Sequence, residues 1–329
     1  MVFIMKQYKV LHISPTPLVD SPRKISECTN LYTNYHSDVI VFNDYPGKLQ
    51  GIFSSRILLF NKAKEFCIQI IRNADIIFVH NFLNNDQEEI VFNNSKSDVK
   101  FVYQAHSPLR EGPVFTKYAS SGGRITFDEK CVISQYQPRL YPDYTIVPNL
   151  ILEKPSLKLL KETEVPIVLF SPSHSRTGGR WNDKTAPLLE RTLQSMEQLG
   201  LISLIVAHGY TPYDLFQIRK KSHITIDEII TGAFHQVSLE GLCAGNVVIN
   251  NSDFFSDLML KSVVKKDIDT PFFKTSLDNF KERFMELVLD HKKIRFLQSQ
   301  SNVYFEKNLL PEKLITHYED IYNRVILDD

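Results

Sequence analysis

The residues of this sequence that are best suited to chemistry lie between positions 223 and 253. A short helix is predicted over 236–244, between a strand that ends near Asp227 and a second strand that begins after Gly245. The first amides of a helix have no partner inside it, and the helix dipole favours negative charge there. The start of this helix is therefore predicted to bind a phosphate or pyrophosphate through the amides of Val237, Ser238 and Leu239.

Glu240 lies close to the start of the same predicted helix. From there its carboxylate can reach a neighbouring hydroxyl group, and a ribose would present two of them. The alternative interpretation is an ordinary turn between a helix and a strand, in which Glu240 only interacts favourably with the helix dipole. The residues alone leave both interpretations open.

Two histidines follow predicted strands in the first half of the chain. His80 ends the run at 75–80, and His106 follows the run at 99–105. Ligands of open parallel sheets bind beyond the carboxyl ends of the strands, so both histidines are candidates for a site there. A lone histidine is more often structural, and His12, inside the first strand, is predicted to be buried structure.

These residues are positioned by short β-branched runs that alternate with helical segments, a pattern typical of parallel sheets covered by helices on both faces. A polar segment at 150–166, with two prolines, separates two such series. The expected strands fall at 8–14, 38–44, 75–80, 99–106, 130–134, 144–149, 166–173, 201–209, 223–227 and 246–250. The sequence therefore predicts two tandem doubly wound, Rossmann-like α/β domains, with the ligand site in the cleft between them.

Two helices carry more specific expectations. Ser21 is predicted to cap the helix after the first strand, with Pro22 at its first position. A helix near 184–199 is predicted to end at Gly200. It is expected to bury one apolar face formed by Leu188, Leu189, Leu193 and Met196.

Composition excludes several classes of protein. The 329 residues carry 38 basic and 38 acidic side chains, a balance that argues against a protein built mainly to hold nucleic acid. No apolar run approaches the roughly 20 residues of a membrane span. The four cysteines are far apart, and no cluster has the spacing of metal ligands, so reduced thiols, no metal and a cytoplasmic location are expected.

Three stretches resemble the GT-B glycosyltransferases, in particular their retaining family 4. The most specific is the donor-nucleotide motif, to which seven positions are similar: Phe234, Leu239, Glu240, Ala244, Gly245, Val247 and Val248. The sequence TIVPN at 145–149 resembles the handover between the two domains of that family, and residues 276–326 resemble its closing helices.

The resemblance implies roles for individual residues. Residues 1–150 would form the acceptor domain, 151–308 the nucleotide-sugar domain, and 309–329 a helix that crosses back to the first domain. Glu240 would hold the ribose, and His106 would face the point of sugar transfer, with His80 near the donor. Arg180 and Lys184 would neutralise the diphosphate, although they are four positions apart where the family usually has five.

One position departs from the family pattern. Gly232 stands where the family has a first Glu that contacts the donor sugar, and Asp227 and Glu228, just upstream, are the candidates to replace it. A non-catalytic GT-B protein that binds a nucleotide sugar or a glycan is therefore an alternative hypothesis.

The expected function is metal-independent, retaining transfer of a sugar from a UDP- or GDP-linked donor to a carbohydrate or lipid-linked acceptor, as in polysaccharide biosynthesis. No cofactor is expected besides this co-substrate, and any contact with a membrane would be peripheral. Nucleic acid is not favoured as a partner, but modified bases in DNA stay open as an alternative acceptor.

Overall fold

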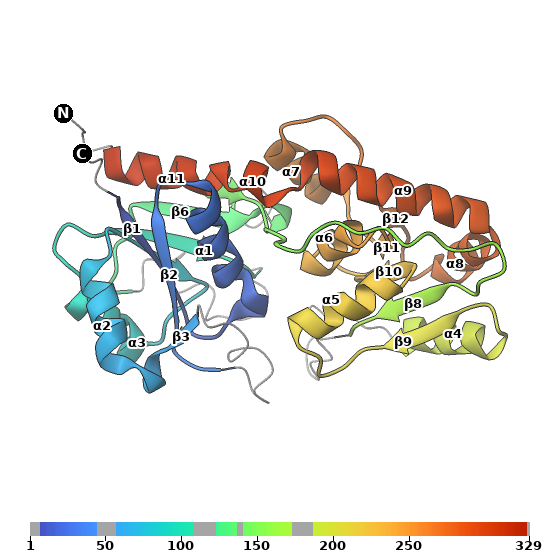
Figure 1. The fold of residues 1–329 in the computed structure, drawn as a ribbon, viewed down its shortest axis with the longest axis horizontal. Coiled ribbons are helices and arrows are strands. Elements are labelled where there is room, and N and C mark those ends of the chain that lie inside the picture. The colour runs from blue at the N-terminus through green and yellow to red at the C-terminus, as the bar shows by residue number, and fades with distance from the viewer. Residues whose placement is uncertain (1–6, 45–56, 108–122, 137–140, 173–186, 328–329) are drawn as a thin grey trace. The chain divides into compact units, whose positions relative to one another are not determined.

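The computed structural model describes residues 7–44, 57–107, 123–136, 141–172 and 187–327. The chain divides into two compact units (Figure 1). Unit 1 comprises Met1–Leu150 together with Pro311–Asp329, and unit 2 comprises Ile151–Leu310. Each unit is built around its own parallel sheet.

The sheet of unit 1 has seven strands in the order β3-β2-β1-β4-β5-β6-β7, all pairing in parallel. Its strands are β1 (Lys9–Ser14), β2 (His36–Val41), β3 (Ile57–Leu59), β4 (Ile76–His80), β5 (Lys100–Ala105), β6 (Glu129–Ile133) and β7 (Thr145–Val147). This is the Rossmann strand order, which reverses direction between β1 and β4. In such sheets the crevice for a ligand opens at this reversal point.

The helices of unit 1 are α1 (Ser21–Tyr32), α2 (Lys64–Asn73), α3 (Asn85–Asn94), α10 (Pro311–Leu314) and α11 (Thr316–Leu327). Asp20 occupies the N-cap position of helix α1, without a capping hydrogen bond from its side chain, so the prediction that Ser21 is the cap is wrong by one position. The reason is a left-handed turn in which Leu18, Val19 and Asp20 have φ angles of 49°, 53° and 68°. The turn brings the chain into the helix at Ser21 itself, and Arg23 holds it by ion pairs with Asp20 and Glu27.

Unit 2 has a five-stranded parallel sheet in the order β12-β11-β10-β8-β9. Its strands are β8 (Ile167–Phe170), β9 (Ser203–Val206), β10 (Ile224–Ile226), β11 (Val247–Asn250) and β12 (Phe273–Lys274). Its helices are α4 (Pro187–Gln198), α5 (Pro212–Lys221), α6 (Gln236–Cys243), α7 (Phe254–Val264), α8 (Phe280–Leu289) and α9 (His291–Asn308). The strand order is the second common doubly wound order, so the predicted fold class of two tandem Rossmann-like units is confirmed.

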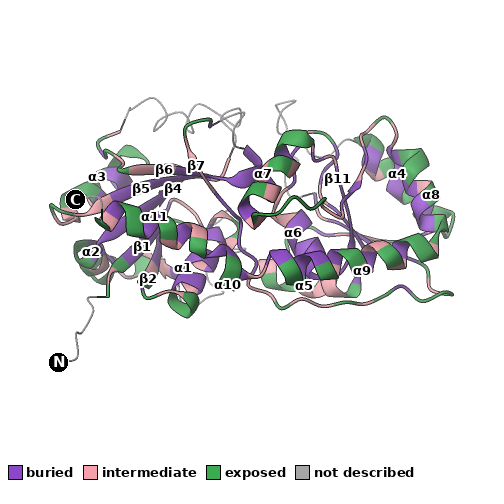
Figure 2. Cartoon of the chain, turned by 90° about the horizontal axis from the view of Figure 1, so that it is seen from above, coloured by how far each residue is buried: buried purple, intermediate pink, exposed green. Residues whose placement is uncertain are grey.

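Both sheets are buried, and the helices turn one buried stripe inward and an exposed stripe outward (Figure 2). Helix α4 buries Leu189, Leu193 and Met196 in the core of unit 2, as the sequence predicts. Leu188 was expected on the same face, but its side chain is 52% exposed. Successive residues of a helix differ by about 100° in direction, and Leu188 falls outside the stripe set by the other three.

The C-terminal segment completes the core of unit 1. The sequence predicts a single helix over 309–326, whereas the structure has the short helix α10, a turn at Ile315 and then α11. The buried Tyr318 hydroxyl of α11 donates to the carbonyl of Pro148 at 2.9 Å and lies 3.0 Å from the Gln104 side-chain nitrogen of β5. The end of the chain is thereby bonded both to the central sheet and to the segment that leaves β7.

None of the helices in the described ranges is long and apolar enough to cross a membrane.

Removal of the Tyr318 hydroxyl should destabilise unit 1. Tyr318→Phe leaves the buried Pro148 carbonyl and Gln104 amide without this partner, which should lower the free energy of unfolding by about 1–3 kcal/mol. The measurement is hydrogen exchange of β5 and β7 peptides in increasing urea. Tyr304→Phe in unit 2 is the matched control, because the buried Tyr304 hydroxyl has no hydrogen-bond partner within the described ranges. Equal effects of the two variants would contradict the role of Tyr318.

Candidate functional site

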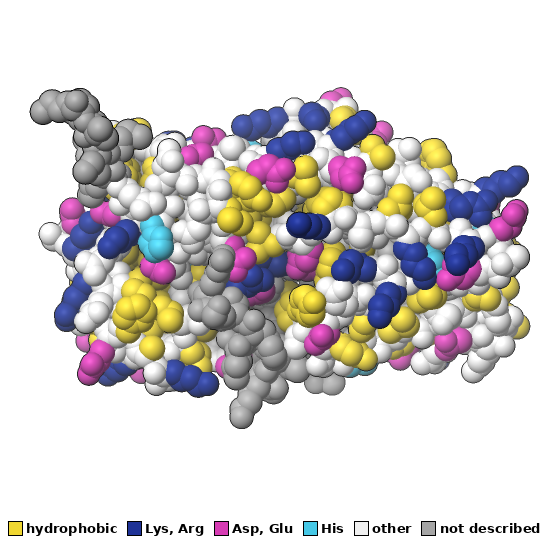
Figure 3. Space-filling model, viewed as in Figure 1, with side chains coloured by type: hydrophobic (Ala, Val, Ile, Leu, Met, Phe, Trp, Pro, Cys, Tyr) yellow, Lys and Arg dark blue, Asp and Glu magenta, His cyan; other side chains and the backbone are white. Residues whose placement is uncertain are grey.

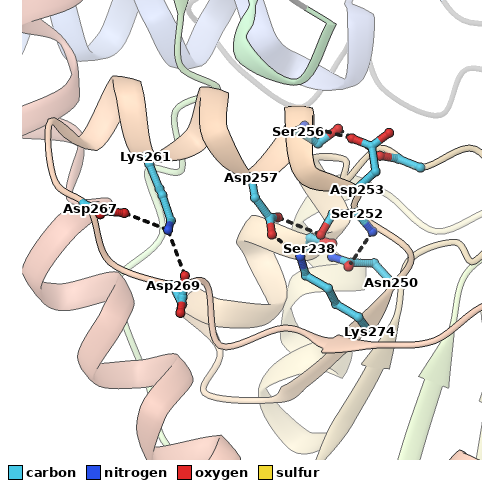
Figure 4. A network of polar contacts seen from close by, with 11 residues as sticks. Ser238, Asn250, Ser252, Asp253, Ser256, Asp257, Lys261, Asp267, Asp269 and Lys274 are labelled. Atoms are coloured by element: carbon cyan, nitrogen blue, oxygen red, sulfur yellow. Dashed lines mark hydrogen bonds and ion pairs between the residues drawn. The ribbon is translucent and has the colours of Figure 1, made fainter.

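The loop between β10 and α6 is held by the first residue after the strand. The carboxylate of Asp227 accepts hydrogen bonds from the backbone amide of His235 at 2.6 Å and from the hydroxyl of Ser238 at 2.7 Å. The Ser238 oxygen also accepts from the side-chain amide of Asn250, at the end of β11, at 2.9 Å (Figure 4). Asp227 therefore caps the start of α6 from the end of the neighbouring strand.

The amides at the start of α6 are only partly available. Ser238 and Leu239 donate their N–H groups to the carbonyl of His235, at 3.0 and 3.5 Å, so the prediction that they are unpaired is wrong. They are satisfied because the first turn of the helix closes on His235. Within the part of the chain that the structure describes, the Val237 amide has no hydrogen-bond partner. Val237 is thus the amide through which this helix can bind an anion.

Glu228 is fully buried and holds the turn that follows it. One carboxylate oxygen accepts from the amides of Ile230 and Thr231, both at 2.8 Å, and the other accepts from the Thr231 hydroxyl at 2.6 Å. Asp227 and Glu228 were the candidates to replace the first Glu of the family pattern. In the structure Glu228 holds this turn and Asp227 holds the start of α6.

Gly232 is required by the conformation of the same loop. Its φ angle is +80°, and a Cβ atom at this position would lie 2.9 Å from a carboxylate oxygen of Asp253. The Gly232 carbonyl accepts from the Asp253 amide and from the Ser256 hydroxyl, both at 2.9 Å. A glutamate at position 232 would be strained by this positive φ and would require the Asp253 side chain to move.

Glu240 lies on the buried side of α6 and binds two side chains. One carboxylate oxygen is 3.1 Å from the Arg219 guanidinium of α5, and the other accepts from the Gln236 side chain at 2.7 Å. The Arg219 side chain is fully buried, and that of Glu240 is 8% exposed. The pair orients Glu240 and keeps its charge compensated.

Arg219 was missed by the sequence analysis. The available signal was its spacing, because it follows the buried Phe216 by three residues and so falls on the inward face of α5. An arginine in a buried stripe needs an acidic partner, which here comes from a different helix.

Two glycines let α6 lie close to its neighbours. A Cβ atom at Gly241 would be 2.7 Å from a methyl group of Val248 on β11. At Gly245, where φ is +66°, it would be 2.6 Å from the carbonyl of Ser156. Gly245, one of the motif positions, therefore lies where the chain turns after a helix and where another backbone segment approaches closely.

The predicted cations Arg180 and Lys184 lie outside the described residues. A polar network continues beside the loop in Figure 4, where Asp257 binds Ser252 and Lys274. Lys261 in the same view binds Asp267 and Asp269, both at 2.8 Å. In the described ranges, no cluster of three or more His, Cys, Asp or Glu residues could hold a metal ion.

In unit 1, three histidines form a continuous hydrogen-bonded chain. His12 Nδ1 is 2.9 Å from His80 Nε2, and His80 Nδ1 is 2.7 Å from His106 Nε2. His12 pairs with Phe78 in the sheet, and His80 pairs with Gln104. His80 follows Phe78 by two residues, and His106 follows Gln104 by two residues. Because residues two apart in a strand point to the same side, all three histidine side chains project from one face of the sheet, at β1, β4 and the end of β5. The chain thus spans the point where the strand order reverses.

The histidine chain is electrically neutral. Burial lowers the pKa of His12 to about 3, with a further contribution from His106, and burial alone lowers the pKa of His106 to about 3. Burial, followed by the neighbouring His106 and His12, also lowers the pKa of His80 well below its usual value. Burial disfavours the charged form of each imidazole, so each ring is neutral and carries one proton at neutral pH.

The backbone around His106 is also fixed. Asn81, which follows β4 in the left-handed region with φ of 60°, accepts a hydrogen bond from the His106 amide at 2.7 Å. Tyr141 donates its hydroxyl to the Ser107 carbonyl at 2.6 Å. His106 itself is half-buried, unlike the fully buried His12 and His80.

Several solved structures are similar to this chain over almost its whole length. An α-glucosyltransferase in complex with UDP and a DNA containing an HMU base has a TM-score of 0.66 at 10% identity, covering 96% of this chain and 99% of the other. Sucrose-phosphate synthase from Thermosynechococcus elongatus has a TM-score of 0.64 at 11% identity, covering 98% and 100%. Anabaena HepE in complex with UDP-glucose has a TM-score of 0.62 at 11% identity, covering 96% and 99%.

No protein-family profile matches the sequence, and no curated protein matches it. The structural likeness extends over almost the whole of each chain, and at these identities it establishes the fold. The chain has the GT-B architecture.

Substitution of Gly232 should destabilise unit 2 without improving any activity. Gly232→Ala combines the strain of a positive φ, about 1–2 kcal/mol, with a collision against Asp253. Gly200→Ala is the matched control, because φ is +71° there but the space around the Cβ is open. Thermal unfolding should show a larger loss for Gly232→Ala, and a Gly232→Glu variant that is as stable as the parent would contradict this account of the loop.

Unit 1 should lose stability as the pH falls below 6.5. The three histidines take up protons near pH 6.5 in the unfolded chain but resist them in the fold, so their stabilisation is complete above that pH and decreases toward pH 3. Each contributes up to about 1.4 kcal/mol per pH unit below 6.5. Hydrogen exchange of β1, β4 and β5 peptides between pH 7 and 5.5, corrected for intrinsic rates, should show the loss.

His12→Asn should reduce this pH dependence, whereas His36→Asn, at an exposed position of β2, should leave it as it is. A stability of unit 1 that does not change down to pH 5.5 would show that the three histidines are not held neutral.

Proposed function

We propose that the protein is a glycosyltransferase that uses a nucleotide-activated sugar. The observation that carries the proposal is the likeness of nearly the whole chain to glycosyltransferases whose structures contain UDP or UDP-glucose. It is supported by the residues around α6, which resemble the donor-nucleotide motif in sequence and form a helix start with the Val237 amide unpaired within the described chain.

In this proposal the diphosphate of the donor binds at the start of α6. The Val237 amide and the helix dipole supply positive potential, and Arg180 and Lys184 supply charge from the segment after β8. Asp227 and Glu228 keep the loop in shape, while Gly232 gives the turn that the loop requires. In unit 1, His106 is proposed to contact the substrate, with the buried His80 bonded to it from behind.

Glu240 is proposed to hold the ribose. Arg219 and Gln236 fix its carboxylate in one orientation. A preoriented carboxylate loses little conformational freedom when the ligand binds, which favours affinity.

The acceptor is proposed to be a carbohydrate or a lipid-linked glycan, with transfer that needs no metal and retains the sugar configuration. The support is electrostatic. Residues 1–150 carry 16 basic and 14 acidic side chains, and on the face shown in Figure 3 basic and acidic groups are interspersed over both units. Binding to DNA usually draws on a strong excess of positive charge.

A modified base in DNA is the second candidate acceptor. Several of the similar structures are complexes of an α-glucosyltransferase with DNA, and one of these contains an HMU base. The two candidates differ in their expected dependence on salt, because contacts with DNA phosphates weaken steeply as salt concentration rises.

The proposal is tested with a panel of UDP-, GDP- and CMP-sugars. We expect one nucleotide class to raise the melting temperature and to be hydrolysed slowly without an acceptor. Lipid-linked glycans and DNA containing HMU are then supplied with that donor, and transfer is detected as a mass increase of one sugar. If no nucleotide sugar binds, the proposal fails; if one binds without any turnover, the protein is a nucleotide-sugar-binding protein.

The role of Glu240 is tested by comparing UDP with 2′-deoxy-UDP in the parent and in Glu240→Gln. The parent should bind 2′-deoxy-UDP about tenfold more weakly, because one hydrogen bond to a charged group is lost, whereas the variant should bind both alike. Glu286→Gln, at an exposed position of α8, is the control and should keep the tenfold preference. If Glu240→Gln still preferred UDP over 2′-deoxy-UDP, Glu240 would not be the residue that binds the ribose.

A further inference from the structure

The histidine chain of unit 1 restricts where its protons can lie. A neutral imidazole carries one proton, so one ring nitrogen donates and the other accepts. Two contacts, His12 Nδ1 to His80 Nε2 and His80 Nδ1 to His106 Nε2, join the three rings in series. If each contact holds one proton and His80 is neutral, the protons must all lie on Nδ1 atoms or all on Nε2 atoms.

The buried end of the chain distinguishes these two arrangements. His12 Nε2 is buried and has no hydrogen-bond partner among the residues that the structure describes. In the arrangement with all protons on Nε2, an N–H group would be buried there without an acceptor. In the other arrangement only a lone pair is left without a partner, which costs less, since unpaired buried N–H groups are the rarer defect in proteins.

We propose that His12 and His80 fix His106 as a neutral imidazole with its proton on Nδ1, so that His106 donates a hydrogen bond to an oxygen of the bound substrate. His12 and His80 are then positioning residues for His106. His106 Nδ1 has no partner in the described part of the chain, and His106 is the half-buried member of the three. The assignment of a substrate oxygen as the acceptor rests on the proposed function.

The same geometry excludes a proton relay. For His106 to act as a base through Nδ1, the chain would have to shift to the arrangement with all protons on Nε2. That shift requires a proton to arrive at His12 Nε2, which is buried among protein atoms. The chain therefore orients His106 and fixes its tautomer, and it does not carry a proton away from the substrate.

The fixed backbone supports this role. Asn81 holds the amide of His106, and the ring of His106 lies 5.0 Å from that of His80, centre to centre. The His12 ring is also packed against Phe78, with centres 5.0 Å apart. With both backbone and ring held, the donor at Nδ1 has one preferred direction before any ligand binds.

The test is a long-range proton–nitrogen correlation spectrum of the full chain labelled with ¹⁵N-histidine at pH 7. The signals are assigned by their loss in His12→Asn, His80→Gln and His106→Gln. We expect the pattern of the Nδ1–H tautomer for all three residues. An Nε2–H pattern at His106, or an average of the two patterns, would overturn the proposal whether or not the protein transfers a sugar.

A pair of variants at His12 extends the test to activity. His12→Phe removes the donor to His80 and should release the tautomers of His80 and His106, lowering kcat for donor hydrolysis about tenfold with little change in KM. In His12→Asn the side-chain amide can replace Nδ1 and should restore most of the rate. His36→Asn, at an exposed histidine of the same unit, should change neither tautomers nor rate.

The outcomes separate the two proposals. Nδ1–H tautomers in a protein that binds no nucleotide sugar would refute the proposed function and leave the inference about the chain intact. Nε2–H tautomers in an active transferase would refute the inference about the histidine chain and leave the proposed function intact. A variant with changed tautomers but an unchanged kcat would show that the orientation of His106 does not matter to the reaction.

Discussion

The structure depends on one constraint: polar side chains at the ends of buried parallel strands must find partners inside the protein, because water does not reach them. In unit 1 three histidines satisfy one another across β1, β4 and the end of β5. In unit 2 Asp227 and Glu228 take up the amides of their own loop. The candidate sites are thus assembled from groups that first stabilise the strand ends.

This constraint also decides which groups remain available for a ligand. At the start of α6 the carboxylate of Asp227 accepts from the His235 amide, and the His235 carbonyl accepts from the amides of Ser238 and Leu239. In the described chain the Val237 amide is left to interact with an anion at this end of the helix dipole. Glu240 depends in the same way on Arg219, since a buried carboxylate without a compensating cation carries a large desolvation cost. A ligand site built in this way is rigid before the ligand arrives.

The return of the chain to unit 1 links the histidine chain to the end of the sequence. Tyr318 and Tyr322 of α11 pack against Phe78, with ring centres 6.5 and 5.4 Å away, and Phe78 in turn packs against His12. Helix α11 therefore covers the sheet face from which the histidines project. The C-terminal residues thereby contribute to the burial of His12 and His80.

The sequence by itself determined the fold class, because β-branched strands alternating with amphipathic helices have few other ways to bury their apolar faces. It also located α6, Gly245 and most strands, but it did not reveal the two-residue strand β12 or the three-residue β3, whose patterns are too short. Only the tertiary structure showed that Arg219 meets Glu240 and that His12 joins His80 and His106. These partners are far apart in the sequence, and their meeting depends on strand order and register, which local residue patterns do not encode.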